Sequence, residues 1–290
     1  MPLKLSYFVP MASGSYDPVN YKISAMQNWN HAAHKYHSDW ASKNRGPFKS
    51  TAELVRAAEI KPGNAVLDIA CGTGAVSRAV SQELGSDGLL VGIDFSHGAL
   101  SIAKSYASPG EFMQMDAEKI GMHAQFDKIL CQYALMFFPN PDKVLRELRT
   151  LMKSTGMLAI SVHGLADRVP YFSTMMAPVL RHIPDIMAPG TPTVHRFGNP
   201  AILEKTICAA GFSNVSIKTF VYQYEVAGFE EYWSDYLSTT AVSIRARIES
   251  DPEKMQAIRS EAQERSRAFM KKDGVFSFPW EVHIATAMPR

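Results

Sequence analysis

The alternation of short apolar runs with helix-length segments between residues 62 and 163 limits most strongly how this chain can fold. Several runs are nearly continuous in apolar residues, as expected of strands that helices cover on both faces. Helix-length segments between such strands are typical of the crossovers in a parallel sheet. The pattern therefore predicts an α/β fold with a doubly wound, mostly parallel sheet. The predicted strands are 65–70, 89–95, 112–115, 128–133 and 157–162.

Capping residues predict where the flanking helices begin and end. Ser50 followed by Glu53 has the spacing of a capping box. Ser96 is placed to cap the helix after the second strand, and Asn140 opens the next helix, which we expect Gly156 to stop. Two later helices are expected after Asn199 and Asp251, each followed by proline, the first ending at Gly211 and the second covering 251–272, with strands at 215–226 and 275–287.

The composition excludes several classes of protein. Apolar residues make up 46% of the chain, enough to fill one large core. Lys and Arg number 30 against 28 Asp and Glu, without a run of five or more like charges, so nucleic acid is not expected as a partner. No stretch is apolar for long enough to span a membrane, and the first 20 residues lack a leader pattern. We expect a soluble, cytoplasmic protein; its three cysteines form no CxxC pair, so neither disulfides nor structural zinc are expected.

A glycine turn after the first predicted strand indicates a ligand site. The segment VLDIACGTG, residues 66–74, places Gly72 and Gly74 where the chain turns into a helix. Glycine lacks a Cβ, so a ligand can approach this backbone closely. A dinucleotide site has a third glycine where this chain has Ser77, and Asp68 would repel its pyrophosphate. A ligand with ammonium and sulfonium groups would instead be attracted by Asp68.

Four motifs in order resemble the class I S-adenosylmethionine-dependent methyltransferases, in particular the small-molecule branch that includes the ubiquinone and menaquinone biosynthesis methyltransferases. The resemblance implies a Rossmann-like, seven-stranded sheet with a helical lid or cap insertion, S-adenosyl-L-methionine as cofactor, and methyl transfer to a small molecule. The motifs are VLDIACGTG (66–74), VGIDFS (91–96), MDAEKI (115–120) and FDKILCQYALMFFPNP (126–141).

The resemblance gives individual residues a role in binding the cofactor. Asp94 would accept hydrogen bonds from the ribose hydroxyls, and Phe95 would lie beside the adenine ring. Asp116 would accept from the adenine amino group, and the Ala117 N–H would donate to the ring. An aspartate at a strand end also commonly caps the next helix, which is the alternative for each acid. The other implied cofactor residues are Asp68, Ala70, Cys71, Gly72 and Gly74 in the turn, with Cys71 as a packing residue, and Cys131, Gln132 and Tyr133 facing the methionine part.

The N-terminal segment resembles the aromatic lid helix of the same family. Its matching residues are Trp29, Asn30, Ala32, Ala33, Tyr36 and Trp40. Tyr36 would reach the methionine carboxylate or cover the sulfonium through a cation–π contact. The alternative is a surface helix that docks its aromatic side chains on the core. His31, His34 and His37 recur every third residue, but no acidic or cysteine partner lies near them, so no metal is expected.

The expected organisation has four parts. Residues 1–48 form the lid region, 49–163 the cofactor-binding α/β core, 164–198 a cap over the acceptor pocket, and 199–290 the rest of the core sheet with an added helical segment. The cap segment carries five prolines, and such an insertion is often a lid or a pocket wall, with a packed connector as the alternative. Phe172, Met175, Met176 and Met187 are candidate pocket walls or ordinary core residues.

Methyl transfer from a sulfonium mainly requires that the acceptor be held close and water excluded. Tyr133 and His163, at the ends of the fourth and fifth strands, are the candidate catalytic residues that would take an acceptor proton; for His163 the alternative is a satisfied hydrogen bond. Residues 131–134 do not match the Asn/Asp-Pro-Pro-aromatic sequence of methyltransferases that act on nucleic-acid bases or glutamine. A small, partly apolar acceptor is therefore expected. The alternatives are a non-catalytic regulatory subunit that binds the cofactor and a nicotinamide-dependent oxidoreductase, and the oligomeric state is open.

Overall fold

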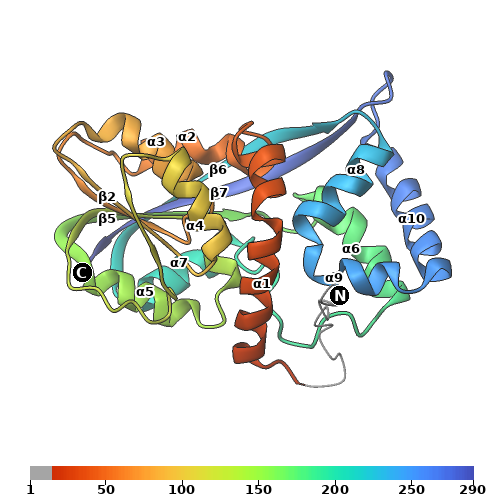
Figure 1. Cartoon of the computed structure of the whole chain (residues 1–290), viewed down its shortest axis with the longest axis horizontal. Coiled ribbons are helices and arrows are strands. Elements are labelled where there is room, and N and C mark those ends of the chain that lie inside the picture. The colour runs from red at the N-terminus through yellow and green to blue at the C-terminus, as the bar shows by residue number, and fades with distance from the viewer. Residues whose placement is uncertain (1–14) are drawn as a thin grey trace, which may run out of the picture.

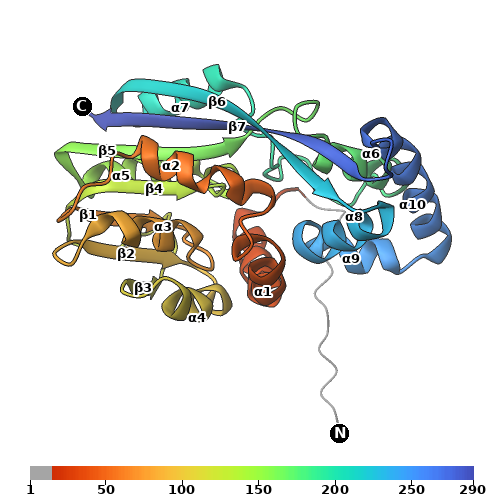
Figure 2. The ribbon, with the colours of Figure 1, turned by 90° about the horizontal axis from the view of Figure 1, so that it is seen from above.

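The computed structural model describes residues 15–290, which form one seven-stranded sheet with helices on both faces (Figures 1 and 2). The strand order is β3-β2-β1-β4-β5-β7-β6; β1 to β5 are parallel, and β7 is antiparallel to its two neighbours. The predicted α/β fold with a mostly parallel, doubly wound sheet is confirmed. The strands are β1 (Ala65–Ile69), β2 (Leu89–Asp94), β3 (Glu111–Gln114), β4 (Phe126–Gln132), β5 (Met152–His163), β6 (Phe212–Val226) and β7 (Phe276–Pro289).

The helices fall into two groups. One group flanks the sheet, and α6, α8, α9 and α10 cluster beside the far ends of β6 and β7, with α1 between the two groups (Figures 1 and 2). No helix within residues 15–290 has both the length and the apolar character that a membrane crossing requires. The expectation that the first 20 residues lack a leader pattern concerns mostly residues 1–14, which lie outside the described residues. The α-helices are α1 (Pro18–Tyr36), α2 (Thr51–Ala57), α3 (Ala75–Leu84), α4 (His97–Tyr106), α5 (Pro141–Thr150), α6 (Pro170–His182), α7 (Pro200–Ala209), α8 (Phe229–Asp235), α9 (Val242–Glu249) and α10 (Pro252–Ser266).

Most of the predicted helix starts are confirmed by their hydrogen bonds. The Ser96 hydroxyl accepts from the Ala99 N–H at 3.1 Å, and the Asn140 side chain accepts from the Lys143 N–H at 2.9 Å. The side chains of Asn199 and Asp251 also cap helices that begin with proline. Each cap satisfies an N–H group that the first turn of a helix leaves without a backbone partner.

Three predicted features of the helices are wrong, although α2 does begin directly after Ser50, as its spacing predicted. The Ser50 side chain makes no cap bond to α2; its hydroxyl instead donates to the Pro47 carbonyl at 2.9 Å. Gly156 does not stop α5, which ends at Thr150, because the chain has already turned into β5 and Gly156 lies inside that strand. The helix expected over 251–272 is shorter, since α10 ends at Ser266 and a 3-10 turn follows it.

The segment 164–198 is less irregular than its five prolines predicted. It contains α6, in which Pro170 is the first residue, where its missing N–H costs nothing, and Pro178 lies inside the helix. Phe172 and Met175 are buried in the main hydrophobic core. Helix α6 of this segment packs against α10 and β7, and the four-part division stays a prediction.

The strand order places a switch point between β1 and β4. Ile69 at the end of β1 is paired with Ile93 of β2 on one side and with Cys131 of β4 on the other. The chain leaves β1 and β4 toward helices on opposite faces of the sheet, and such a point creates a crevice at the carboxyl ends of the strands. The loops that follow β1, β2 and β4 therefore meet at one edge of the sheet.

A buried carboxylate joins the helical cluster to the rest of the molecule. Asp235, at the end of α8, accepts from the indole N–H of Trp40 at 2.9 Å, from the hydroxyl of Tyr171 at 3.0 Å and from the hydroxyl of Tyr224. These donors come from the π-helix η1 (His37–Ala41) after α1, from α6 and from β6. Their rings and that of the fully buried Trp280 contact one another edge to face or tilted.

Removing this carboxylate should destabilise the fold. Asp235→Ala leaves three buried donors without an acceptor, so we expect the free energy of unfolding to fall by about 3 kcal/mol. Urea unfolding followed by tryptophan fluorescence measures this loss. Asp185→Ala, which removes an exposed ion pair with Arg247, is the matched control and should leave the midpoint nearly unchanged. Equal midpoints for the two variants would show that Asp235 is not a structural acceptor.

Candidate functional site

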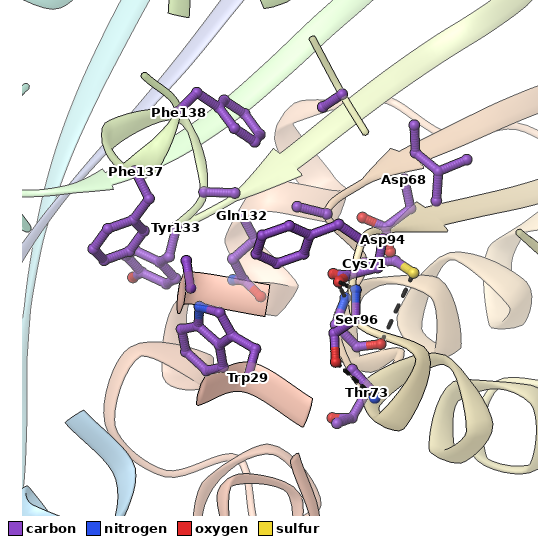
Figure 3. Close-up of a pocket in the computed structure, with 18 of the residues that line it drawn as sticks. Trp29, Asp68, Cys71, Thr73, Asp94, Ser96, Gln132, Tyr133, Phe137 and Phe138 are labelled. Atoms are coloured by element: carbon purple, nitrogen blue, oxygen red, sulfur yellow. Dashed lines mark hydrogen bonds between the residues drawn. The ribbon is translucent and has the colours of Figure 1, made fainter. Parts of the chain in front are cut away.

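A cavity opens at the carboxyl edge of the sheet, at the switch point (Figure 3). In Figure 3, Cys71, Thr73 and Asp94 lie on one side of the cavity, and Trp29 and Phe137 lie on the other. The cavity is thus polar where β1 and β2 end and aromatic beyond β4. Its lining comes from α1 (Tyr21, Lys22, Ala25, Trp29, Ala33, Tyr36), from Phe48, from the ends of β1 and β2 and the turns after them (Asp68, Ala70, Cys71, Gly72, Thr73, Ile93, Asp94, Phe95, Ser96), from the starts of α3 and α4 (Ala75, Val76, Ala99), from Met115, Asp116 and Ala117, and from 132–134 and 137–139.

The two glycines of the turn after β1 have different tasks. Gly72 has φ 54°, and a Cβ built there would meet nothing within 4 Å. Gly72 therefore borders open space, which a ligand can approach. Gly74 has φ 88°, and its Cβ would lie 3.1 Å from the Cβ of Ala107 and 3.2 Å from Ala103. Gly74 does not line the cavity; it lets α4 pack closely against the turn.

Asp68 is buried at the end of β1 and faces the cavity. One of its oxygens accepts from the hydroxyl of Ser77 at 2.6 Å. Burial raises the pKa of Asp68 to about 7, although the hydrogen bonds from Ser77 oppose this shift. Ser77 stands where a dinucleotide site has its third glycine, and here its side chain is committed to an acid that would repel a pyrophosphate.

Asp94, at the end of β2, has both oxygens held by backbone N–H groups. The N–H of Gly72 donates to one oxygen and that of Ser96 to the other, each at 2.8 Å. Burial nevertheless raises the pKa of Asp94 to about 6. A carboxylate has about four acceptor positions, so two remain for a ligand with two adjacent hydroxyls.

The next acid along the cavity, Asp116, is bound by α1. One of its oxygens lies 2.6 Å from the ammonium of Lys22, and the other accepts from the Glu118 N–H at 2.9 Å. Phe95 and Ala117 line the same part of the cavity. The structure thus brings together Phe95, Asp116 and Ala117, the three residues expected around one aromatic ring.

Helix α1 covers the cavity with one face. Lys22, Ala25, Trp29 and Tyr36 line it at spacings of three, four and seven residues, which repeat on one side of a helix. Tyr36 packs edge to face against Trp29 and Phe48, and burial raises the pKa of its phenol. The expected lid residue Trp40 lies beyond α1, in the π-helix, and belongs to the Asp235 cluster.

Tyr133 lies at the cavity wall, and its hydroxyl is hydrogen-bonded to Ser50. Ser50 donates its only hydroxyl proton to Pro47, so at 2.7 Å it accepts from the hydroxyl of Tyr133. Burial raises the pKa of Tyr133 well above its usual value. Its backbone has φ 52°, a left-handed conformation that bulky residues rarely adopt. The Tyr133 ring is held in place, and in this arrangement its hydroxyl donates to Ser50.

His163 lies behind Tyr133 and does not line the cavity. Its ring stacks on that of Tyr133 with centroids 4.3 Å apart, and its Nδ1 accepts from the indole N–H of Trp280 at 3.1 Å. Burial lowers the pKa of His163 well below its usual value. A neutral ring whose Nδ1 accepts carries its proton on Nε2, so His163 has the satisfied hydrogen bond that was its alternative.

Several other predicted residues lie outside the cavity or have a structural contact. Cys131 is buried in the core, where burial raises the pKa of its thiol to about 12. Gln132 lines the cavity and accepts from the Thr51 hydroxyl at 3.1 Å. The expected pocket walls from the segment 164–198 do not line this cavity: Phe172 and Met175 are core residues, and Met176 and Met187 pack against that core.

The three histidines of α1 and the following turn do not converge. His31 and His34 are exposed, and His37 lies 3.1 Å from the Thr73 hydroxyl through its Nδ1. Within residues 15–290 no three His, Cys, Asp or Glu side chains are close enough to hold a metal ion.

The sequence reasoning missed part of the cavity. Tyr21, Lys22, Ala25, Phe137 and Phe138 line it but were not assigned to it. The helical spacing of Lys22 and Ala25 with Trp29 was the available signal for α1. For Phe137 and Phe138 it was their place in the loop directly after β4, where a switch-point ligand is contacted.

Comparisons with known proteins agree with this geometry. A family model described as "Methyltransferase domain" matches residues 60–188. The ubiquinone biosynthesis O-methyltransferase of Paraburkholderia phymatum is 30% identical over 166 residues, which are 55% of this chain and 69% of that protein. The aklanonic acid methyltransferase of a Streptomyces species is 29% identical over 158 residues, 50% of this chain and 71% of that protein.

Solved structures show the same fold. A putative methyltransferase from Bacillus halodurans superposes with a TM-score of 0.56 at 20% identity, over 83% of this chain and 100% of that chain. The phosphoethanolamine N-methyltransferase 2 of Haemonchus contortus, solved in complex with S-adenosyl-L-methionine, superposes with a TM-score of 0.51 at 16% identity, over 83% of this chain and 53% of that chain.

The raised pKa of Asp68 makes a prediction about stability. A carboxyl that holds its proton more tightly when folded stabilises the folded state below the unfolded pKa of about 4, and this contribution is lost as pH rises to about 7. We expect the free energy of unfolding to fall by on the order of 3 kcal/mol between pH 4.5 and 8 through this group. Asp68→Asn, which cannot ionise, should flatten this decline in urea titrations. A decline of the same size in both proteins would contradict the burial argument.

Proposed function

The chain belongs to the S-adenosylmethionine-dependent methyltransferases, and from this premise we propose that it methylates a small, partly apolar aromatic molecule held beside Trp29, Phe137 and Phe138. It is an enzyme of this class, and S-adenosyl-L-methionine is its cofactor. The comparisons support neither the regulatory-subunit nor the oxidoreductase alternative. The observation that carries the proposed acceptor is one continuous cavity with an acidic half and an aromatic half.

The residues of the acidic half fit the cofactor. Asp94 has acceptor positions left for two ribose hydroxyls, and Gly72 leaves open space in front of its backbone. Asp68 is a buried carboxylate without a cationic partner among its hydrogen bonds and ion pairs within residues 15–290, so it gains from a positive ligand. We propose that Asp68 attracts the cationic methionine part, Asp94 binds the ribose, and Phe95, Asp116 and Ala117 surround the adenine.

When bound, the cofactor supplies a methyl carbon on a cationic sulfur, so its leaving group is already activated. The chain then has to hold the acceptor in line with that carbon and keep water out. We propose that α1 excludes water, with Tyr36 and Trp29 above the methyl group, and that Tyr133 positions the acceptor through its ring. A cation beside these faces is stabilised by their π electrons.

The remaining step is the loss of a proton from the acceptor. The hydroxyl of Tyr133 donates to Ser50, and His163 is buried behind it with its Nδ1 occupied. We therefore propose that Tyr133 orients the acceptor and that His163 supports the Tyr133 ring, with neither taking the proton. The acceptor must then be acidic enough to ionise in the cavity, as a phenol or a carboxylic acid is.

The relatives are consistent with such an acceptor. Those matched here are named for ubiquinone biosynthesis and for aklanonic acid. A net charge of only +2 does not favour binding to a phosphate backbone, so we keep the proposal that nucleic acid is not a partner. Location in the cytoplasm and the oligomeric state stay open predictions.

The cofactor placement can be tested through Asp94. Asp94→Ala removes both ribose acceptors, so S-adenosylhomocysteine should bind at least about tenfold more weakly in calorimetry. The matched control is Asp127→Ala, an acid at the other end of the sheet that binds Lys153 and should bind the ligand like the unchanged protein. His163→Gln should also bind normally. Normal binding by Asp94→Ala would disprove the placement.

The acceptor proposal can be tested by turnover. The purified protein is given the cofactor and a panel of phenols, quinol precursors, aromatic acids, thiols and aliphatic alcohols, and S-adenosylhomocysteine is measured. We expect product from aromatic hydroxyl or acid acceptors, and a rise in acceptor KM of about tenfold for Phe138→Ala, since a half-buried ring that lines the cavity is lost. S-adenosylhomocysteine affinity should be unchanged in that variant. Turnover confined to thiols or alcohols would contradict the proposal.

A further inference from the structure

Helix α1 is attached to the cofactor cavity at two points. Near its middle, the Asn30 side chain accepts from the hydroxyl of Ser96 and from the N–H of Gly98, both at 2.9 Å. Two turns earlier, the ammonium of Lys22 lies 2.6 Å from Asp116 and 3.1 Å from Glu118. The first attachment is neutral, whereas the second is ionic and uses the acid proposed to read the adenine.

No residue in the first half of α1 is fully buried, although Tyr21, Ala25 and Met26 are half-buried. The buried residues of the helix are Ala32 and Ala33, both near its C-terminal end. Val19 and Ile23, on the turns around Lys22, are 62% and 46% exposed. The first half of α1 thus lacks fully buried side chains, and the ion pairs of Lys22 add to the contacts that hold it against the cavity.

The acids that bind Lys22 are themselves fixed. Glu118 is 8% exposed, and its second carboxylate oxygen accepts from the Asn140 N–H at 2.7 Å, at the start of α5. Asp116 accepts from the Glu118 N–H. Lys22 thus closes onto a rigid pair of carboxylates, and a fixed partner makes an ion pair stronger than one between two mobile side chains.

We propose that Lys22 is a positioning residue that closes α1 over the adenine end of the cofactor by binding Asp116 and Glu118, and that it thereby sets how fast the cofactor leaves. The inference rests on the cofactor placement proposed above. A carboxylate oxygen has two acceptor positions, so Asp116 can hold Lys22 and still accept from the adenine amino group. Lys22 also keeps Asp116 turned toward the cavity, so the same contact serves closure and recognition.

The test compares Lys22→Met with Lys35→Met. Lys35 also lies on α1 and pairs with Asp39, but it does not line the cavity, so it controls for the loss of a charge from this helix. Stopped-flow tryptophan fluorescence follows the release of S-adenosylhomocysteine, because Trp29, one of four tryptophans, lines the cavity. We expect release from Lys22→Met to be about fivefold faster, with less dependence on salt, and release from Lys35→Met to be unchanged.

A second readout separates positioning from general loosening. S-inosylhomocysteine carries a carbonyl in place of the adenine amino group, so a correctly held Asp116 should disfavour it. Its affinity relative to S-adenosylhomocysteine should rise in Lys22→Met and return to the original ratio in Lys22→Arg, which keeps the charge. Equal release rates for the two methionine variants, or an unchanged ratio, would overturn the proposal. Failure of the unchanged protein to bind S-adenosylhomocysteine would instead overturn the cofactor placement on which it rests.

Discussion

Burial of acids without a protein cation at the carboxyl edge of the sheet is the constraint on which the site depends. Asp68 and Asp94 end two neighbouring parallel strands, so the sheet itself brings them to one crevice. Burial raises the pKa of Asp68 to about 7 and that of Asp94 to about 6. An empty site therefore holds these groups at a cost that a positively charged ligand offsets, which links cofactor binding to stability.

The three acids differ in how the fold has prepared them. Asp94 accepts from two backbone N–H groups, and its remaining acceptor positions suit two hydroxyl donors of a ligand. Asp68 accepts from a single hydroxyl, that of Ser77, and has no positively charged partner within residues 15–290. Asp116 already carries the ammonium of Lys22. Along the cavity, Asp116 and Asp94 are therefore suited to accept hydrogen bonds from neutral groups, and Asp68 is suited to attract a positive charge. This order matches a ligand that is a nucleoside at one end and cationic at the other.

The sequence predicted those parts of the site that local motifs determine. The glycine turn, the strand-end acids and the caps at Ser96 and Asn140 depend on neighbouring residues, so their spacing was sufficient. His163 was harder to place, because its burial depends on Trp280, 117 residues later in the chain. Lys22 was missed because its partner Asp116 lies 94 residues away. The cap bond predicted for Ser50 is absent because its hydroxyl contacts Pro47 and Tyr133, the latter 83 residues away.

The aromatic half of the cavity limits the chemistry more than any single side chain does. Within residues 15–290 the acids that line the whole cavity are the ones proposed to bind the cofactor. The hydroxyl proton of Tyr133 is donated to Ser50. A cavity of this kind selects its acceptor by shape and acidity, since an oxygen that ionises by itself is drawn to the cationic sulfur. The pH dependence of turnover would then follow the ionisation of the acceptor, and it would shift from one acceptor to the next without any change in the protein.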